Sequence, residues 1–317
     1  MHICMQPVLL LACGSFNPIT TMHLRMMELA RDCVESRRSC NVENESRESG
    51  AKSNPYRVVL GGVLSPTSDN YSKPELVAAS IRIELCRLAC QHHSDWLVVD
   101  PWEGSQPTWT RTRIVVERMQ SLCERLWCNF GQDQTRETEC SSNTQLGLIS
   151  DDWLNERIRR LVAYYKRETD SLVHEPPAGT GSDLGSPKTA DNGNHTSHVA
   201  PRVQLVCGAD LLQSFGVPNL WSAEDIEVLV RDYGIICIER PGTDARKFIA
   251  SSEILRKYQD DIFVVSDECR NALSATIVRK SLKLGQSVRY LVPDAVLEMI
   301  YRRNLYGARI PSQHFSQ

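Results

Sequence analysis

The sequence predicts an α/β protein built on a doubly wound parallel sheet with polar insertions. The first observation behind this fold class is that short apolar runs rich in β-branched residues alternate with longer amphipathic stretches. The second is that each apolar run is followed by a helical pattern, and parallel strands require such helical crossovers. Helices would then cover both faces of the sheet, as a doubly wound architecture needs.

Six short apolar runs are predicted to be buried strands. In chain order they are Val8 to Cys13, Arg57 to Val63, Trp96 to Val99, Val203 to Cys207, Gly234 to Ile238 and Ile262 to Val265. Six longer stretches carry apolar residues at three- and four-residue spacing, which indicates helices. These are Met22 to Val34, Val77 to Gln91, Thr110 to Arg125, Ser222 to Val230, Thr276 to Leu284 and Pro293 to Arg303. Ser222 resembles a helix N-cap, and Gly285 resembles a C-terminal stop.

Two polar stretches interrupt this alternation and set the domain organisation. Residues 36–55 show no apolar periodicity, which predicts a surface loop. Residues 128–201 contain a run rich in Gly, Ser, Pro and Asn and only one helical candidate, Asp151 to Arg167, so we expect a largely disordered insertion. The insertion divides one sheet-forming domain into a first half, residues 1–127, and a second half, residues 202–317.

The composition of the 317-residue chain is sufficient for a sizeable core, since 41% of its residues are hydrophobic. A net charge of -3 with 24% charged residues excludes an electrostatically driven nucleic-acid binder. The longest apolar run, Val8 to Cys13, is too short to cross a bilayer, and no secretory signal precedes it. We therefore expect a soluble, cytoplasmic protein.

The twelve cysteines do not predict a metal or redox site, because no pair has C-x-x-C spacing. Cys13, Cys207 and Cys237 lie in or at the ends of apolar runs and are expected to be reduced core residues. Three further cysteines near the start of the insertion could accept a lipid, although buried or free thiols are the expected state. These are Cys123, Cys128 and Cys140.

The strongest chemical signal follows the first strand, where Gly14-Ser15-Phe16-Asn17-Pro18 precedes Thr20 and His23 at the start of a helix. A glycine turn lets the backbone approach a ligand closely, and the free amides of the following helix face an anion. Thr20 and His23 are three residues apart, so both are expected to point at a bound phosphate. For this segment alone, the alternative is an ordinary strand-turn-helix connection in which His23 merely caps the helix.

A similar construction follows the last strand, at Ser274-Ala275-Thr276-Ile277-Val278-Arg279. Ser274 or Thr276 is expected to cap the helix and donate a hydroxyl to phosphate, with Arg279 supplying a charged fork one turn later. A solvated helix start with a basic face is the ordinary alternative for such a segment.

The middle of the chain offers groups suited to a ribose and a flat ring. The fourth strand leads to Gly208-Ala209-Asp210 and then to Asn219-Leu220-Trp221. These segments supply a backbone turn, a carboxylate and an aromatic face. A core position is the alternative for Trp221.

Together these segments resemble the eukaryotic nicotinamide/nicotinic acid mononucleotide adenylyltransferases of the nucleotidyltransferase superfamily. GSFNPITTMH, CGADLLQSF, VPNLW and SATIVR are similar to signatures of that family and stand in the same order. LSPTSDNYSK, DWLVVDPWE and RYLVPDAVLEMI extend the resemblance over both halves of the chain. The resemblance implies a Rossmann-like nucleotidyltransferase fold. It also implies adenylyl transfer from ATP to nicotinamide mononucleotide (NMN) or nicotinic acid mononucleotide (NaMN), releasing pyrophosphate without a covalent enzyme intermediate.

The resemblance also implies the roles of individual residues. His23 and Arg279 would be the catalytic residues, both in contact with the ATP phosphates. The other ATP-binding or phosphate-binding positions would be Gly14, Ser15, Phe16, Thr20, Lys73, Ser274 and Thr276. The positions matched to the mononucleotide or dinucleotide are Ser15, Phe16, Met22, Lys73, Trp109, Thr112, Gly208, Asp210, Leu220, Trp221, Arg240 and Asn271. Trp109 is the expected stacking platform for the pyridine ring, and Trp102 is expected to be a core residue.

The expected cofactor is Mg²⁺, which would arrive with ATP. Magnesium commonly binds through substrate phosphates and water, so no dedicated protein ligands are expected for it.

Three positions depart from the family pattern. Ile277 stands where eukaryotic relatives commonly have lysine, so one positive charge near the triphosphate would be missing. Pro74-Glu75 replaces a more basic or glycine-bearing continuation, and Asp267 stands where a glutamate is usual. None of these changes touches His23 or Arg279, so we expect activity to survive.

Two other interpretations compete with this one. A cytidylyltransferase or a pantetheine-phosphate adenylyltransferase of the same superfamily shares the first motif, but the central VPNLW block argues against both. The alternative from another functional class is a nucleotide-binding, chaperone-like protein with little turnover. Ile277 and the long insertions favour it. The preference between NMN and NaMN stays open, as does a homo-oligomeric state, and membrane contact through the insertion is not expected.

Overall fold

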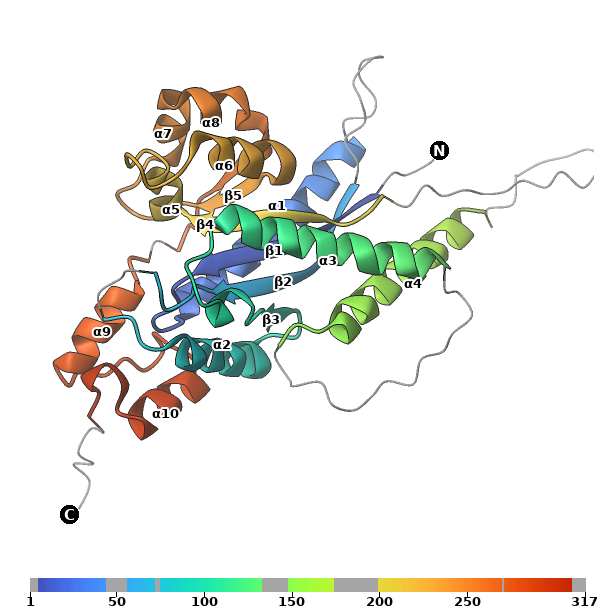
Figure 1. Ribbon diagram of the computed structural model, residues 1–317. Coiled ribbons are helices and arrows are strands. Elements are labelled where there is room, and N and C mark those ends of the chain that lie inside the picture. The colour runs from blue at the N-terminus through green and yellow to red at the C-terminus, as the bar shows by residue number, and fades with distance from the viewer. Residues whose placement is uncertain are drawn as a thin grey trace, which may run out of the picture.

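The computed structural model describes residues 5–43, 56–71, 75–132, 148–173, 199–269 and 271–309. The strands within these ranges are β1 (Met5–Gly14), β2 (Tyr56–Pro66), β3 (Leu97–Val99), β4 (Arg202–Gly208), β5 (Ile235–Ile238) and β6 (Ile262–Val265). They form one sheet in the order β3-β2-β1-β4-β5-β6, and every neighbouring pair is parallel (Figure 1). Each predicted strand is present, and the predicted doubly wound α/β class is confirmed.

Helices connect the strands and extend beyond them at the C-terminal end. They are α1 (Thr21–Glu43), α2 (Ala79–His93), α3 (Thr112–Gln132), α4 (Asp151–Val173), α5 (Ala209–Ser214), α6 (Ala223–Val228), α7 (Ala245–Ser251), α8 (Glu253–Lys257), α9 (Ala275–Lys283) and α10 (Asp294–Arg302). The predicted helices correspond to α1, α2, α3, α6, α9 and α10, and a π-helical turn, Leu229–Tyr233, continues α6. The apolar periodicity does not predict the short helices α5, α7 and α8.

Both predicted helix boundaries are confirmed by their capping geometry. The Ser222 hydroxyl accepts a hydrogen bond from the Asp225 backbone N–H at 3.1 Å, as an N-cap does. Gly285 follows α9 with φ at 70°, in the left-handed region that glycine adopts readily.

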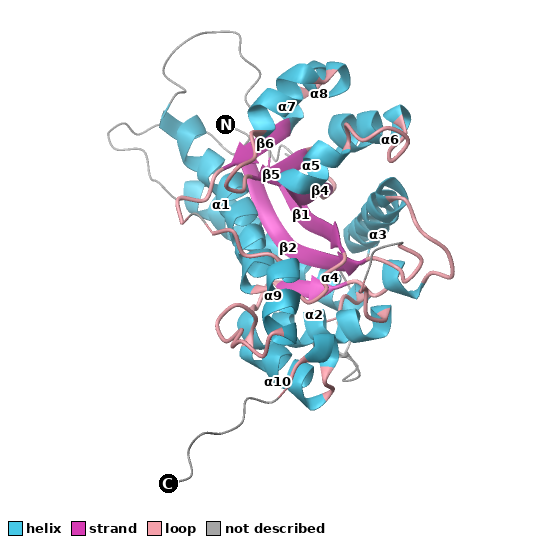
Figure 2. Ribbon diagram, turned by 90° about the vertical axis from the view of Figure 1, so that its left-hand side faces the viewer, coloured by secondary structure: helices cyan, strands magenta, loops and turns pink. Residues whose placement is uncertain are grey.

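Alternate residues of β1 belong to two cores on opposite faces of the sheet. Val8, Leu10 and Ala12 pack with residues of α1, α2, α9 and α10. Leu9 and Leu11 pack with residues of α3 to α8. Figure 2 shows this division, with α1 and α9 on one side of the sheet and α3, α5 and α6 on the other. Burial on both faces explains why the central strand is apolar from Val8 to Cys13.

The first part of the polar loop predicted over residues 36–55 is helical instead. Helix α1 continues to Glu43, so residues 36–43 are helical. The sequence of this part has no apolar periodicity, so the pattern could not predict that the helix continues. Residues 44–55 lie outside the described residues.

The stretch predicted as a largely disordered insertion, residues 128–201, contains a helix that belongs to the packed domain. Leu154, Ile158 and Leu161 of α4 are buried in the core on the α3 side of the sheet. Trp153 of the same helix approaches β2 so closely that a Cβ on Gly61 would lie 2.5 Å from its ring. Helix α3 also continues to Gln132, beyond the predicted boundary at residue 127. Residues 133–147 and 174–198 lie outside the described residues.

Replacing Ile158 by alanine is expected to lower the free energy of unfolding by about 2–5 kcal/mol, because it removes a buried side chain from a packed core. Arg159→Ala, on the exposed face of the same helix, is the matched control and is expected to stay within about 0.5 kcal/mol of the parent. Urea unfolding of the two variants measures the difference. An Ile158→Ala protein as stable as the control would show that α4 is not part of the cooperative domain.

The core cysteines carry free thiols, as expected, with Cys207 and Cys237 buried opposite each other on β4 and β5 and Cys13 half-buried. A hydrogen bond with Cys237, together with burial, holds the pKa of Cys207 well above its usual value. Of the three cysteines considered as lipid acceptors, Cys123 is buried in α3, Cys128 is exposed, and Cys140 lies outside the described residues. No helix in the described part of the chain is both long and apolar enough to span a membrane.

Candidate active site

The predicted functional residues lie on segments that follow the carboxyl ends of the parallel strands. The strand order runs from β1 toward β3 in one direction and from β4 toward β6 in the other. In such sheets the crevice at this reversal, outside the carboxyl ends, is where ligands bind. The first motif follows β1, the central segments follow β4 and β5, and the late motif follows β6.

His23 lies in the first turn of α1 and is held there by Thr20. The Nδ1 atom of His23 accepts a hydrogen bond from the Thr20 backbone N–H at 2.9 Å and lies 2.9 Å from the Thr20 hydroxyl. Because Nδ1 accepts from a backbone N–H, a neutral His23 carries its proton on Nε2. Thr20 is fully buried. Its side chain therefore orients the imidazole, and its contact with phosphate stays a prediction.

The turn between β1 and α1 is held in place by buried side chains. Phe16 is buried, with φ at 42°, and its ring packs edge-on against the ring of His23 at a centroid distance of 5.2 Å. A Cβ on Gly14 would lie 3.4 Å from the same phenyl ring, which shows how closely the ring packs on the turn. The Ser15 carbonyl accepts a hydrogen bond from Arg82 at 2.9 Å. This fully buried arginine also binds the loop that follows β2, and it fixes the two loops together.

The late motif joins the same turn through Arg279. Ser274 is the N-cap of α9, and its hydroxyl accepts from the Ile277 backbone N–H at 3.3 Å. Arg279 is buried, and its guanidinium donates to the Asn17 carbonyl at 2.8 Å and to the Thr276 hydroxyl at 3.4 Å. The structure therefore brings together the motifs after the first and last strands, although they are far apart in the sequence.

A carboxylate already contacts the guanidinium of Arg279. The Arg279 Nε lies 3.4 Å from a Glu75 side-chain oxygen, and the Nζ of Lys283 donates to the other oxygen. Hydrogen bonds from Lys283 and then from Arg279 lower the pKa of Glu75, so its side chain is ionised at neutral pH. Glu75 has φ at 61°, and its carbonyl accepts from the Asn17 side chain at 2.8 Å. This residue stands where the sequence departs from the family pattern.

Two of the residues matched to the nucleotide also come together. Asp210 and Arg240 face each other at 4.0 Å beyond the ends of β4 and β5. A Cβ on Gly208 would lie 2.5 Å from an Asp210 side-chain oxygen, so a larger residue there would displace the Asp210 side chain. Two other predicted residues have structural contacts. The Asn271 side chain accepts from the Leu273 backbone N–H at 2.8 Å, and Met22 packs against the core on the α1 side of the sheet.

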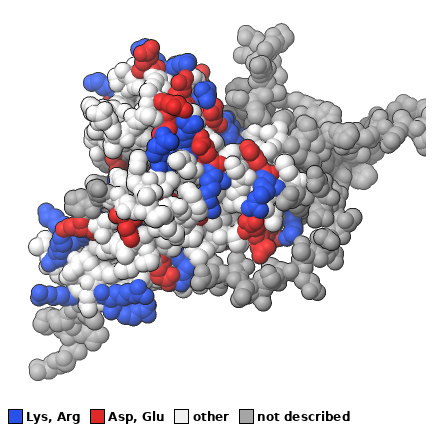
Figure 3. Space-filling view, in the orientation of Figure 1, with Lys and Arg blue, Asp and Glu red and all other residues white. Residues whose placement is uncertain are grey.

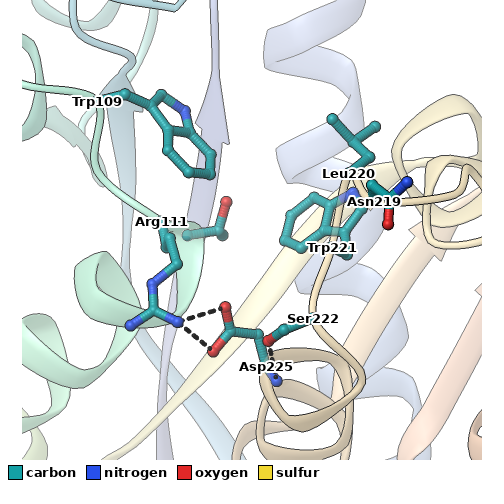
Figure 4. A pocket seen from close by; sticks show the side chains of 8 residues that line it. Trp109, Arg111, Asn219, Leu220, Trp221, Ser222 and Asp225 are labelled. Carbon is teal, nitrogen blue, oxygen red and sulfur yellow. Dashed lines mark hydrogen bonds and ion pairs between the residues drawn. The ribbon is translucent and has the colours of Figure 1, made fainter.

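A surface pocket gathers the residues predicted for the pyridine ring (Figure 4). It is lined by Trp109, Arg111, Thr112, Asn219, Leu220, Trp221, Ser222 and Asp225. Trp109 and Leu220 are each 48% exposed, whereas Trp221 is anchored by a 3.0 Å hydrogen bond from its indole nitrogen to the Ser214 hydroxyl. Figure 4 shows Trp109 and Trp221 on opposite sides of the pocket. Two indole faces at one opening suit a flat aromatic ring.

Half of the pocket lining was not predicted from the sequence. Asn219 and Ser222 flank the predicted Leu220-Trp221 pair, and Arg111 stands between Trp109 and Thr112 in the chain. The position of Arg111 beside two predicted residues was therefore a usable signal. Asp225 lies on α6, and only the three-dimensional fold shows that it lines the same pocket as Trp109 and Arg111.

The loop after β3 contains a buried carboxyl group. Glu103 is buried, accepts a 2.7 Å hydrogen bond from the Ser65 hydroxyl, and has its pKa raised by burial from 4.5 to about 7. Because the folded-state pKa lies above the ordinary one, the contribution of Glu103 to stability is present at low pH. It is lost as the pH rises through about 7. Trp102 beside it is half-buried under the guanidinium of Arg118 and packs against the α3-side core.

Charged side chains also lie around the late motif. Ile277 is 44% exposed and adds no charge, whereas α9 carries Lys280 and Lys283 in its last turn. Figure 3 shows Lys and Arg side chains gathered over the region of α9 and α10. Asp267 pairs with Arg25 at 3.3 Å. Lys73, the remaining predicted phosphate ligand, lies outside the described residues.

Comparison with known proteins identifies the family. The model of the Cytidylyltransferase-like family matches residues 11–281. The chain is 37% identical over 301 residues to nicotinamide/nicotinic acid mononucleotide adenylyltransferase 1 of Bos taurus, and the match covers 95% of this chain and 89% of the relative. The chain belongs to the nicotinamide/nicotinic acid mononucleotide adenylyltransferases.

A second relative of this adenylyltransferase family extends over nearly the full length of both chains. Nicotinamide/nicotinic acid mononucleotide adenylyltransferase 2 of Danio rerio is 32% identical over 312 residues, covering 94% of this chain and 96% of the relative. A solved Plasmodium falciparum nicotinic acid mononucleotide adenylyltransferase complexed with NaAD has a TM-score of 0.43 and 13% sequence identity to this chain. That match covers 95% of this chain and 98% of the other. Membership of the adenylyltransferases decides against the rival enzymes of the same superfamily.

Proposed function

We propose that this adenylyltransferase transfers the adenylyl group of ATP to NMN or NaMN, forming NAD or deamido-NAD and pyrophosphate. The observation that carries the proposal is the assembly of His23 and Arg279 beside one turn, at the same edge of the sheet as the Trp109 and Trp221 pocket. One end of the site is built for phosphate, and the other is built for a flat ring. The relatives' names support this assignment.

The reaction needs positioning and charge stabilisation from the protein. A phosphate oxygen of the mononucleotide attacks the α-phosphorus of ATP, forming the new phosphoanhydride bond. The bond from the α-phosphorus to the bridging oxygen breaks, and pyrophosphate leaves with the electron pair. Because the attacking oxygen is already ionised, no protein nucleophile or strong base is required.

His23 would supply a hydrogen-bond donor at the phosphates, and α9 would supply positive charge. Because Nδ1 of His23 accepts from the Thr20 backbone N–H, we expect the Nε2–H of the neutral imidazole to donate toward ATP. Arg279 and Thr276 would bind the β- and γ-phosphates, with the start of α9 contributing its helix dipole. Ser274 caps α9 and stays a predicted phosphate contact, because its hydroxyl can still donate its proton. Gly14, Ser15 and Phe16 form the turn beside which the nucleotide would lie.

The remaining nucleotide would lie along the sheet edge. Gly208, Asp210 and Arg240 would hold the adenosine ribose, and the indole of Trp109 would stack on the pyridine ring. Magnesium would enter with ATP and neutralise phosphate charge, bound to phosphate oxygens and water. Within the described ranges, no three His, Cys, Asp or Glu side chains gather as a metal site.

The proposed function is tested by incubating the purified chain with ATP, Mg²⁺ and either mononucleotide. Dinucleotide and pyrophosphate are expected in equal amounts. If the folded, ATP-binding chain forms no dinucleotide from NMN or NaMN, the enzymatic proposal is wrong and the chaperone-like alternative is favoured. A cytoplasmic location and a homo-oligomeric state stay predictions from the sequence.

Replacing Glu75 by glutamine is expected to lower the KM for ATP by about tenfold, because one charge-assisted contact to Arg279 no longer competes with phosphate. The KM for the mononucleotide is expected to change little, since Glu75 lies away from the pyridine pocket lining. Initial rates at varied ATP measure the effect. Glu84→Gln, which removes a carboxylate paired with Arg87 on α2, is the control. A KM for ATP that rises in Glu75→Gln would mean that Glu75 assists ATP binding.

A further inference from the structure

The lining of the pyridine pocket includes a positively charged side chain, Arg111, which is not needed for stacking a ring on Trp109 or Trp221. Arg111 lies immediately before α3, two residues after Trp109, and its guanidinium points to the Asp225 carboxylate in Figure 4. The ring substituent is the only difference between the two candidate substrates. NMN carries a neutral carboxamide, whereas NaMN carries a carboxylate.

We propose that Arg111 binds the ring carboxylate of NaMN and makes the nicotinic acid nucleotide the preferred substrate of this chain. The inference rests on the proposed adenylyl transfer and adds to it the chemical class of the pyridine substrate.

The first argument is the difference in exposure between Arg111 and its partner. Arg111 Nη1 lies 3.1 and 3.2 Å from the two carboxylate oxygens of Asp225. The Arg111 side chain is 50% exposed, whereas that of Asp225 is only 4% exposed. The guanidinium therefore covers the carboxylate, and a ligand that enters the pocket meets positive charge.

The second argument is the hydrogen-bonding capacity that Arg111 retains. A guanidinium has five N–H donors and no acceptor. Only Nη1 contacts Asp225, so within the part of the chain that the structure describes the donors on Nε and Nη2 are not used by protein. A carboxylate can accept from such a fork with two oxygens, whereas a carboxamide offers one oxygen and an NH₂ group that the fork repels.

The third argument is that Asp225 does not depend on Arg111 alone. Arg113 also reaches an Asp225 oxygen at 3.4 Å, and the Asp225 backbone N–H is capped by Ser222. The buried carboxylate therefore keeps a second cation when Arg111 turns toward a ligand. The first turn of α3, which begins at Thr112 in the same lining, adds backbone N–H groups and the positive end of a helix dipole.

The test compares kcat/KM for NaMN and NMN in the parent and in Arg111→Gln. The parent is expected to prefer NaMN by about tenfold or more, the value of one hydrogen-bonded charge pair. Arg111→Gln is expected to remove most of this preference through a loss on NaMN, with NMN changing by no more than about threefold. The double variant Arg111→Gln with Asp225→Asn removes both charges and should show the same loss of preference. This variant excludes the explanation that the exposed Asp225 carboxylate of Arg111→Gln repels NaMN.

Two controls separate charge recognition from general damage to the pocket. Arg113→Gln removes a neighbouring cation that does not line the pocket, so the ratio of the two kcat/KM values is expected to persist. Trp109→Ala removes the stacking face and is expected to lower kcat/KM for both substrates alike. A parent that prefers NMN, or a ratio unchanged in Arg111→Gln, would overturn the inference while leaving adenylyl transfer intact.

A measurement of mononucleotide binding tests the inference even if the chain shows no turnover. Calorimetric titration of the folded parent and of Arg111→Gln with NaMN and NMN reads the same preference without chemistry. Tighter binding of NaMN that Arg111→Gln abolishes supports the assignment of Arg111. Equal binding of the two mononucleotides by the parent contradicts it.

Discussion

Replacing His23 by alanine is expected to lower kcat for dinucleotide formation by about 10²–10³, the usual cost of removing one preorganised donor from a charged transition state. The imidazole is held by the Thr20 backbone N–H and by the edge of the Phe16 ring. These contacts fix the ring before ATP arrives, so its removal should act on the chemical step more than on ATP binding. Initial rates at saturating ATP and mononucleotide measure the loss.

His93→Ala is the matched control for this substitution, because His93 is exposed in the last turn of α2, away from the site. It is expected to leave kcat unchanged. A His23→Ala enzyme that is folded and retains at least a third of the parent kcat would show that His23 has no catalytic role.

Replacing Arg279 by lysine is expected to lower kcat/KM for ATP by about 10²–10³, although the charge is retained, because an ammonium cannot reproduce the planar fork. The guanidinium binds the Asn17 carbonyl and the Thr276 hydroxyl at once. A lysine can satisfy only part of this geometry while facing the leaving pyrophosphate. The loss should therefore appear in both kcat and the KM for ATP.

Arg279 is buried and contacts the turn between β1 and α1. The thermal stability of Arg279→Lys must therefore be measured together with its kinetics. Lys280→Gln, on the exposed side of the same helix, is the control and should change kcat/KM by no more than about threefold. Near-parent kcat/KM for ATP in a stable Arg279→Lys protein would show that the fork does not bind the triphosphate.

The strands and long helices could be predicted because local pattern and burial agree in them. The β1 strand is apolar on both faces since it lies in the middle of the sheet, and α9 and α10 are long enough for a 3.6-residue period to appear. Helices α5, α7 and α8 are too short for a period and are stabilised by tertiary contacts, such as those of Leu212 and Leu255 in the α3-side core. Similarly, α4 gives a local helical pattern, but nothing local shows that Trp153 packs on β2.

The parts of the candidate site that follow strands could also be predicted, because parallel strands place their carboxyl ends at one edge. The contacts between distant segments could not. Arg82 joins two loops from within a helix pattern, and Glu75 reaches Arg279 across the chain. In the pyridine pocket, Arg111 pairs with Asp225 over a long sequence separation. Each pairing depends on the whole topology and leaves no periodic trace in the sequence.

The stereochemical course at the α-phosphorus of ATP tests direct adenylyl transfer most directly. ATP made chiral at this phosphorus with oxygen isotopes is converted by the purified chain, and the configuration of the dinucleotide is determined. In-line attack by the mononucleotide phosphate, positioned by His23 and Arg279, predicts inversion. Retention of configuration would require two displacements through a covalent adenylyl-protein and would contradict the proposed mechanism.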